Sequence, residues 1–224
     1  MSKAAKTNRL NRFIFLSAAY LAVLSPSIAQ TSISVPPTEP VAGISQADWS
    51  KAWWQWAGSF DQSDSPVADR TGKNCHLGQN GPVWFLAGTY GSKRTQRTCE
   101  IPRDKFVFFP LINYVVMPGT GDGQACRSCC ATYIKSAKSV TDQPSNLVLD
   151  LDGRRIKDLA THRQSTKQCF DMGALAKPLY RIFPSAANGY YVMLRPLSPG
   201  RHVLNFGGEL PGLSQALTYS LLVR

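Results

Sequence analysis

The stretch that decides the fold class is "YYVMLRPLSPGRHVLNFGGELPGLSQALTYSLLV", which runs from Tyr190 to Val223. Three segments within it, "YYVMLRPL", "RHVLNFGG" and "ALTYSLLV", are rich in β-branched and aromatic residues, and turn residues separate them. In the last segment, large apolar residues alternate with smaller or more polar ones, as a strand with one buried face requires. We therefore predict three antiparallel strands, the first two joined through Ser198-Pro199-Gly200.

Further strands divided by turns are predicted upstream. The segments "PVWFLAGTY" (82–90) and "KFVFFPLINYVV" (105–116) combine β-branched with aromatic residues, and Pro110 marks a sheet edge or a β-bulge. Further along, "LVLDL" and "RRIKDL" flank Asp152-Gly153, a pair typical of a tight type I′ hairpin turn. We predict a mainly β fold, namely an antiparallel β-sandwich or jelly roll stapled by disulfides.

One short amphipathic helix is predicted before the strands. Ser45 followed by Asp48 forms an N-cap signature, with an acidic residue near the positive end of the helix dipole. Four aromatic residues then recur at helical spacing: Trp49, Trp53, Trp56 and Phe60. We interpret this stripe as core that faces a sheet, with a binding platform as the alternative. Trp54 lies off the stripe and is therefore the candidate ligand-binding residue.

Residues 1–29 have the three parts of a cleavable signal peptide. A basic region without acidic residues comes first, an apolar stretch from Phe13 to Leu24 follows, and small residues at Ser27 and Ala29 mark a cleavage site. The apolar stretch is shorter than the roughly 20 residues that a membrane-spanning helix needs. We therefore predict cleavage after Ala29, a periplasmic or extracellular location, and no membrane span in the mature chain.

The mature chain divides into a short leader and one domain. Residues 30–44 are polar and contain prolines, as in an extended or flexible leader. Residues 45–224 are predicted to form a single β-rich domain, since their number is ample for one hydrophobic core. No pattern in the sequence indicates an oligomeric state.

The chain is basic, with 25 Lys and Arg against 14 Asp and Glu and a net charge of +11. The basic residues are scattered and form no dense run. A solvated surface accounts for such scatter. Attraction to anionic envelope components, such as acidic glycans or lipid head groups, is the functional alternative. Nucleic acid is not expected as the partner of an exported protein.

All six cysteines follow the signal peptide, which favours disulfides in an oxidising compartment. Cys75 and Cys99 bracket a segment that a hairpin can fold back on itself, so we predict that they pair. The cluster "CRSCC", which contains Cys126, Cys129 and Cys130, then contributes one bond to Cys169 and one internal bond. A redox pair or a soft-metal site is the alternative for this cluster.

No catalytic motif stands out, and no cofactor or metal is expected. The sequence has no "GxSxG" nucleophile elbow, and His76, His162 and His202 show no metal-ligand spacing. Paired carboxylates of the kind that glycoside hydrolysis requires are the remaining catalytic hypothesis. The candidates are Asp150 and Asp152 beside the hairpin turn, together with Glu100 and Glu209; a calcium site would use Asp150, Asp152 or Asp122.

Several blocks of the sequence carry a resemblance to known proteins. The segments "LDLDGRRI" (149–156) and "LRPLSPGRHVLNFGG" (194–208) resemble the turn-and-strand pattern of extracellular β-sandwich modules. Together with "GPVWFLAGTYG" from Gly81, "RTCEIP" from Arg97 and "FFPLIN" from Phe108, the order of blocks is similar to that of uncharacterised secreted bacterial proteins. The resemblance implies a shared fold and no particular activity.

These features lead to three functional hypotheses. The first is a non-catalytic secreted or periplasmic protein that binds a carbohydrate or an anionic envelope ligand through aromatic and basic surfaces. The second is a polysaccharide hydrolase or lyase that uses paired carboxylates. The third is a structural component of the envelope. A deep cleft with two carboxylates would favour the enzyme, and a shallow aromatic strip would favour the binding protein.

Overall fold

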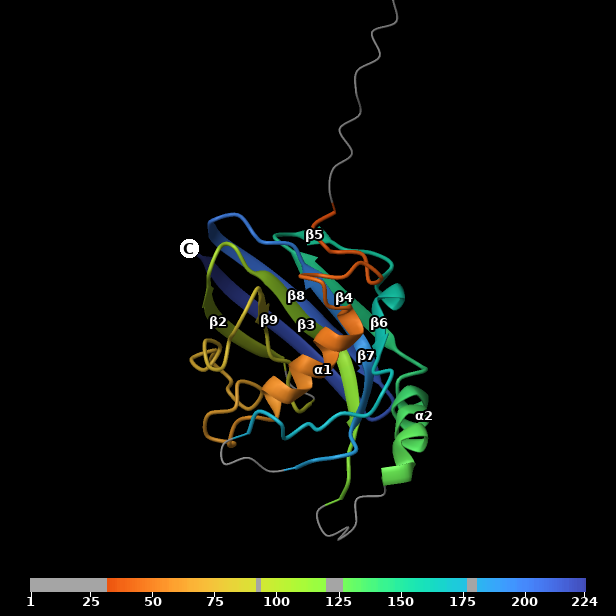
Figure 1. Cartoon of the computed structure of the whole chain (residues 1–224). Coiled ribbons are helices and arrows are strands. Elements are labelled where there is room, and N and C mark those ends of the chain that lie inside the picture. Colours follow the sequence, from red (N-terminus) through yellow and green to blue (C-terminus); the bar gives the residue numbers. More distant parts are fainter. Residues whose placement is uncertain (1–31, 92–93, 120–126, 177–180) are drawn as a thin grey trace, which may run out of the picture. The chain divides into compact units, whose positions relative to one another are not determined.

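Two β-sheets form the framework of the described chain in the computed structural model (Figure 1). The structure describes residues 32–91, 94–119, 127–176 and 181–224. These residues belong to one compact unit, Ser32–Arg224, and the signal peptide predicted for residues 1–29 lies outside the described residues. The fold is mainly β, as predicted.

The first sheet has four strands and the second has five. The order in the first sheet is β1 (Val83–Phe85), β3 (Phe106–Val116), β7 (Ala186–Leu194) and β6 (Arg163–Ser165). The order in the second sheet is β2 (Thr95–Ile101), β9 (Leu213–Val223), β8 (Gly200–Leu210), β4 (Ser145–Leu151) and β5 (Arg154–Arg155). The helices are α1 (Gln46–Ala57) and α2 (Cys130–Val140), with short 3₁₀ helices η1 (Arg127–Cys129) and η2 (Leu159–His162).

Both sheets are mixed, so the prediction of purely antiparallel sheets is wrong. Strand β1 pairs in parallel with β3, and β2 pairs in parallel with β9. In the sequence, β2 lies between β1 and β3 but belongs to the second sheet. The chain therefore leaves the first sheet after β1 and returns to it as β3, so no tight hairpin joins β1 to β3. A strand pattern in the sequence does not reveal which sheet the strand joins, and the direction of pairing depends on that choice.

The three C-terminal strands form as predicted, but they do not lie in one sheet. Strands β8 and β9 make a long antiparallel hairpin in the second sheet, whereas β7 pairs with β3 and β6 in the first. Residues 195–199 therefore carry the chain from one sheet to the other. The physical reason is burial, because every residue of β7 is buried and the strand needs a layer on each of its faces.

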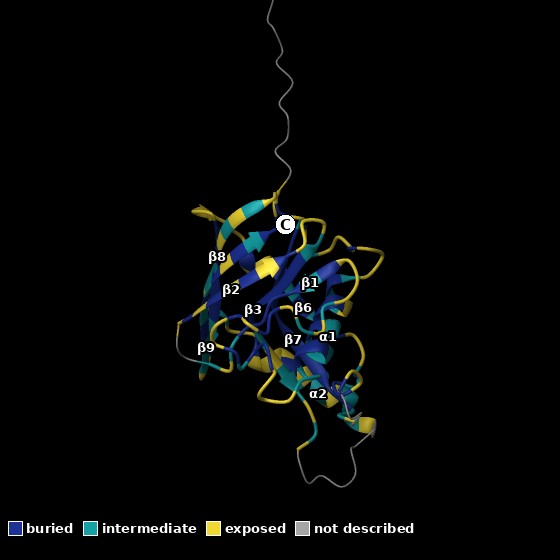
Figure 2. Cartoon of the chain, turned by 90° about the vertical axis from the view of Figure 1, so that its left-hand side faces the viewer, coloured by how far each residue is buried: buried dark blue, intermediate teal, exposed yellow. Residues whose placement is uncertain are grey.

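Strand β7 separates two hydrophobic clusters. Val192 belongs to the cluster between the sheets, where the rings of Phe109 and Phe206 have centroids 4.4 Å apart. Tyr191 and Met193 belong to a second cluster, which contains the aromatic face of α1. Successive side chains of β7 point to opposite faces of the sheet, so this one strand contributes to both hydrophobic clusters. Figure 2 shows the buried strands β3 and β7 between α1 and the second sheet.

Helix α1 begins at the predicted position. The Ser45 hydroxyl accepts a hydrogen bond from the Asp48 N–H at 3.1 Å and caps the helix. Trp49, Trp53 and Trp56 are buried, and each indole N–H donates to a main-chain carbonyl at 2.9–3.1 Å. The aromatic stripe is therefore part of the core, which confirms the favoured interpretation of its spacing.

Residues 32–44 belong to the segment predicted as a flexible leader, yet they pack against the domain. Val35 is fully buried, and its N–H donates to the Met193 carbonyl at 2.8 Å. Gln46 Nε2 donates to the Pro36 carbonyl at 2.6 Å, which ties the segment to α1. The Val35 side chain belongs to the hydrophobic cluster that contains the aromatic face of α1, an apolar contact that a flexible leader would lack.

Helix α2 was not predicted, since the sequence indicated one helix only. Of the α2 residues, only Ala137 is buried, so the apolar stripe by which an amphipathic helix is recognised in a sequence is nearly absent. Tertiary contacts hold the helix instead: Arg163 donates to the Lys138 carbonyl at 2.8 Å, and Cys130 forms a disulfide with Cys169. None of the helices in the described ranges has the length and apolar character needed to cross a membrane.

Two local turn predictions are confirmed. In the β4–β5 hairpin, Asp152 and Gly153 have φ of 53° and 79°, the left-handed backbone that a type I′ turn requires. In β3, the register against β7 shifts between Pro110 and Ile112, which is a β-bulge. Local turn chemistry was sufficient for both because each depends on residues adjacent in sequence.

Candidate ligand-binding site

Trp54, the binding candidate from the sequence, is not an exposed platform. Its ring is partly buried and packs edge-on against Trp53, with centroids 5.1 Å apart. Its indole N–H donates to the Tyr191 hydroxyl at 2.9 Å, and Asn113 donates to the same oxygen at 3.1 Å. Burial raises the pKa of Tyr191, so this hydroxyl stays neutral. Trp54 helps to fix α1 on the first sheet, because a position beside the buried stripe still borders the core.

The two aspartates of the predicted carboxylate pair serve the β4–β5 turn. Asp150 Oδ1 accepts from the Gly153 N–H at 3.0 Å. Asp152 Oδ1 accepts from the Val203 N–H at 2.8 Å, and its Oδ2 lies 2.7 Å from His202 Nδ1. Both carboxylates are therefore engaged by the hairpin and by the strand beside it.

His202 links Asp152 to Ser198 in an order that resembles a catalytic triad. Ser198 Oγ lies 3.4 Å from His202 Nε2, but the Ser198 carbonyl oxygen is nearer, at 2.8 Å. Since a carboxylate and a carbonyl oxygen are both acceptors, the two contacts favour the protonated imidazole, in which both ring nitrogens donate. A charged imidazole cannot take the proton of a hydroxyl. The three residues form a clamp between the hairpin turn and the β7–β8 connection.

Local electrostatics favour the charged forms of both residues in this clamp. Partial burial opposes the charge on His202, but hydrogen bonds to Asp152 and to the Ser198 carbonyl outweigh it and raise the His202 pKa. Partial burial also opposes the charge on Asp152, and hydrogen bonds from His202 and Val203 outweigh it and lower the Asp152 pKa. The two shifts agree in direction with one imidazolium–carboxylate pair.

The two predicted glutamates lie on different elements and have different partners. Glu100 of β2 forms an ion pair with Arg224, with a nitrogen–oxygen distance of 3.4 Å. Glu209 of β8 accepts from the Asn146 side chain at 2.7 Å. Among the described residues, no hydrogen bond joins either glutamate to Asp150 or Asp152.

The histidines do not converge either. His76 is exposed, whereas His162 is buried, and this burial lowers the His162 pKa. Over the described ranges, no group of three or more His, Cys, Asp and Glu side chains is placed to hold a metal ion. Asp122, the further calcium candidate, lies outside the described residues.

Disulfides account for the cysteines that the structure describes. Cys75 and Cys99 form a disulfide with Cα atoms 5.9 Å apart, the pairing predicted from the sequence. Cys130 and Cys169 form another, with Cα atoms 5.6 Å apart. Cys129 is also disulfide-bonded. The remaining cysteine, Cys126, lies outside the described residues.

The most exposed large hydrophobic side chain of the described chain is Tyr90, at 73%. It follows β1 in the short segment "GTYG" (88–91). Two cavities of about 350 and 500 Å³ adjoin it, and both are lined by Tyr90 and Gly91. Their sizes are within the range of small-ligand sites. The first is also lined by Arg70, Thr89, Thr95 and Arg97, and the second by Glu209, Leu213 and Ser214.

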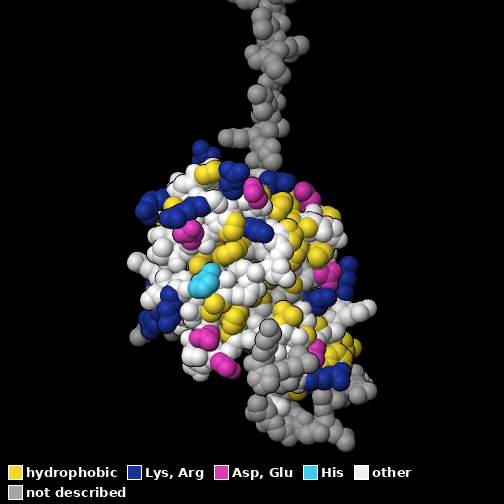
Figure 3. Space-filling view, turned by 60° about the vertical axis from the view of Figure 1, so that its left-hand side comes forward, with side chains coloured by type: hydrophobic (Ala, Val, Ile, Leu, Met, Phe, Trp, Pro, Cys, Tyr) yellow, Lys and Arg dark blue, Asp and Glu magenta, His cyan; other side chains and the backbone are white. Residues whose placement is uncertain are grey.

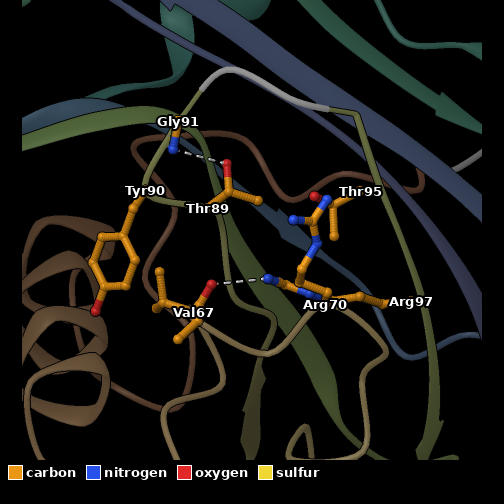
Figure 4. Close-up of a pocket in the computed structure, with 8 residues that line it drawn as sticks. Val67, Arg70, Thr89, Tyr90, Gly91, Thr95 and Arg97 are labelled. Atoms are coloured by element: carbon orange, nitrogen blue, oxygen red, sulfur yellow. Dashed lines mark hydrogen bonds between the residues drawn. The ribbon is translucent and has the colours of Figure 1, made fainter. Parts of the chain in front are cut away.

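A buried arginine holds the main chain below Tyr90. Arg97 of β2 is only 3% exposed. It donates to the carbonyl oxygens of Val67, Asp69, Ala87 and Gly88 and to the Tyr219 hydroxyl, at 2.7–3.0 Å. Figure 4 shows the bond to the Val67 carbonyl. A guanidinium is costly to bury unless its donors are paired, so these bonds fix the two loop segments relative to β2.

A buried glutamine holds the residue that precedes Tyr90. Gln215 of β9 is 6% exposed, and its Oε1 accepts from the Thr89 N–H at 3.0 Å. Its Nε2 donates to the carbonyl oxygens of Pro110 and Leu111, at 2.8 and 2.7 Å, in the bulge of β3. One side chain therefore connects the Tyr90 segment to both sheets, and the exposed ring stands on a fixed base.

The charges differ on the two sides of Tyr90. On one side, Arg70 is exposed, and its side chain extends toward Thr95 in Figure 4. On the other side, Glu209 lines the second cavity. On the face drawn in Figure 3, Lys and Arg side chains are dispersed and do not form one basic patch. The candidate site thus offers an aromatic ring between a basic and an acidic hydrogen-bonding group.

Sequence reasoning placed Tyr90 at the end of a predicted strand, but β1 ends at Phe85. The two glycines around the tyrosine are the signal that could have found it. A Cβ on Gly88 would lie 2.5 Å from Gln215 Oε1, and Gly91 has a φ of 137°. An aromatic residue between two such glycines is typical of a constrained surface loop.

Comparison with known proteins finds no matching family model, no similar curated protein and no similar solved structure. The resemblance to secreted bacterial proteins and β-sandwich modules therefore stays a prediction from sequence blocks. Function has to be argued from the geometry of this chain.

Proposed function

We propose that the protein is exported and binds a carbohydrate or an anionic glycan of the cell envelope without converting it, with Tyr90 as the stacking surface. The observation that carries the proposal is the contrast at this residue: the ring is 73% exposed, while Arg97 and Gln215 hold the main chain around it. An aromatic face packs on the apolar face of a sugar ring. A ring on a fixed base loses little entropy when it binds.

The groups beside Tyr90 define the ligand chemistry of the proposal. Arg70 would donate to sugar hydroxyls and would pair with a carboxylate or phosphate on an acidic glycan. Glu209 and Ser214, which line the other cavity, would accept from or donate to further hydroxyls. Each group adds orientation, while the stacked ring adds most of the contact area.

Export is the second part of the proposal. Its support is the signal-peptide pattern of residues 1–29 together with the two disulfides in the described chain. We further infer a sandwich-like arrangement of the two sheets, which share one hydrophobic cluster. The hydrolase hypothesis has less support, because Asp150 and Asp152 are engaged in the hairpin and Glu100 in an ion pair.

Binding to purified glycans tests the proposal. The exported protein would be run in affinity gels that contain a neutral glucan, an acidic glycan or solubilised peptidoglycan, and retardation would be measured. We expect Tyr90→Ala to weaken the retained interaction roughly fivefold, about 1 kcal/mol for one stacked ring, without a change in melting temperature. Arg70→Gln should weaken binding to the acidic glycan more than binding to the neutral one.

Tyr114→Ala is the matched control, because Tyr114 is a tyrosine of β3 that is 38% exposed and lines neither Tyr90 cavity. It should bind as the wild type does. Equal retention of the wild type and Tyr90→Ala would reject the stacking site. No retention of the wild type by any of the glycans would favour the structural envelope component.

A further inference from the structure

We propose that the Cys130–Cys169 disulfide is a site of reversible thiol–disulfide exchange with a small anionic thiol. The juxtaposition that carries the inference is a cavity of about 460 Å³ between α1 and the segment that follows β6, lined by Cys169 and by two lysines. This inference is independent of the glycan site, since none of the residues that line the two Tyr90 cavities lines this one.

The two described disulfides differ in their access to solvent. Cys75 and Cys99 are 8% and 1% exposed and belong to the hydrophobic cluster between the sheets. Cys130 and Cys169 are both half-buried, and Cys169 lines the cavity. Exchange requires a thiolate to reach a sulfur atom, so access decides which disulfide reacts. The protein therefore contains one disulfide between buried residues and one between partly exposed residues.

The cavity beside Cys169 carries more positive than negative side chains. Lys51 and Lys167 line it together with Asp48, and Lys51 lies 3.3 Å from the Asp48 carboxylate. Asp48 interacts electrostatically with both lysines, so the three side chains together leave one net positive charge, and Lys167 is exposed to an entering ligand. A thiol with carboxylate groups is therefore favoured over a cationic thiol. The cavity volume is within the range of small-molecule sites.

The exchange step balances without an added oxidant. An external thiolate attacks the Cys169 sulfur, a mixed disulfide forms on Cys169, and the bond to Cys130 breaks with its electron pair on the Cys130 sulfur. Cys130 is the first residue of α2, where the helix dipole favours a negative charge. The Cys130 thiolate then reverses the step by attacking the mixed disulfide, which releases the external thiolate.

Mass spectrometry of the intact oxidised protein tests the exchange. The probes are glutathione, which has a net negative charge, and cysteamine, a cationic thiol, at equal thiolate concentrations. After rapid alkylation, peptide mapping should find the glutathione adduct on Cys169 and the alkyl group on Cys130, while Cys75 and Cys99 stay joined. The first adduct should form faster with glutathione than with cysteamine.

A charge-matched pair of variants isolates the role of the cavity. Lys167→Gln should slow the glutathione reaction roughly two- to fivefold, the effect of one exposed charge, and leave the cysteamine reaction no slower. Lys157→Gln removes the same charge from an exposed residue outside this cavity and should leave both rates unchanged. A first adduct on any other cysteine, or equal slowing by the two variants, would overturn the proposal.

Discussion

The aromatic face of α1 and the Tyr90 segment use similar side chains for opposite purposes. Trp49, Trp53 and Trp56 are at most 7% exposed, and the indole N–H of each of these three donates to a main-chain carbonyl. Tyr90 is 73% exposed, and the buried polar contacts around it hold its main chain and not its ring. The difference shows that a dense aromatic stripe marks a core, whereas one aromatic between two glycines marks a candidate binding surface.

The largest effect should come from Trp53, the centre of the buried stripe. Trp53→Ala should lower the free energy of unfolding by about 3–5 kcal/mol, because it leaves a cavity and removes the indole N–H that donates to the Leu86 carbonyl. Tyr90→Ala should change it by less than about 0.5 kcal/mol, as for other exposed side chains. Denaturant unfolding of both variants checks the contrast, and similar losses for the two would erase it.

An intermediate effect should come from Gln215, which connects the Tyr90 segment to the core. Gln215→Met keeps the volume but removes the partners of the Thr89 N–H and of the Pro110 and Leu111 carbonyls. The free energy of unfolding should fall by about 1–3 kcal/mol. Glycan binding should weaken as well, since the base of Tyr90 loosens.

Gln96→Met is the control for this change, because Gln96 is an exposed residue of β2. It should leave both stability and binding as in the wild type. If Gln215→Met lost stability but bound glycan with wild-type affinity, the fixed base would be irrelevant to binding.

The smallest effect concerns the clamp of His202 and Asp152, a polar contact that is neither core nor exposed platform. The folded-state pKa of His202 is raised, so its contribution to stability is complete below the unfolded pKa of about 6.5 and is lost as pH rises through the folded value. His202→Gln should therefore lower the melting temperature at about pH 6 and have little effect at about pH 9. The expected contribution is about 1 kcal/mol or less.

Both His202→Gln and the wild type retain His162, so the difference between their melting temperatures at each pH does not contain the contribution of His162 to stability. Burial lowers the His162 pKa, so its contribution has the opposite sign: it is complete above about pH 6.5 and is lost as pH falls. His76→Gln, at an exposed position, serves as the control. A His202→Gln deficit that grows with rising pH would contradict the charged clamp.

Predictions from local patterns were confirmed where neighbours in sequence decide the structure. The Ser45 cap, the Asp152-Gly153 turn and the bulge at Pro110 each depend on contacts within a few residues. The buried aromatic face of α1 follows from helical spacing alone. The pairing of Cys75 with Cys99 is also confirmed, although β1 and β2 within that segment join different sheets and do not form the predicted hairpin.

Predictions about position failed where a contact joins distant parts of the chain. Trp54 lies off the helical stripe, yet the hydroxyl of Tyr191, far along the chain, accepts a hydrogen bond from its indole N–H. Helix α2 carries too weak a pattern to be recognised and depends on Arg163 and on the disulfide to Cys169.

The sequence by itself determined that this chain is mainly β, that α1 buries an aromatic face, and where its tight turns lie. Only the tertiary structure decided that β7 and β8 belong to different sheets and that Tyr90 stands exposed above Arg97 and Gln215. The physical reason is range. Propensity and periodicity act over one turn or one strand, whereas burial on both faces of β7 and the pairing of a buried guanidinium depend on residues that meet only after the chain has folded.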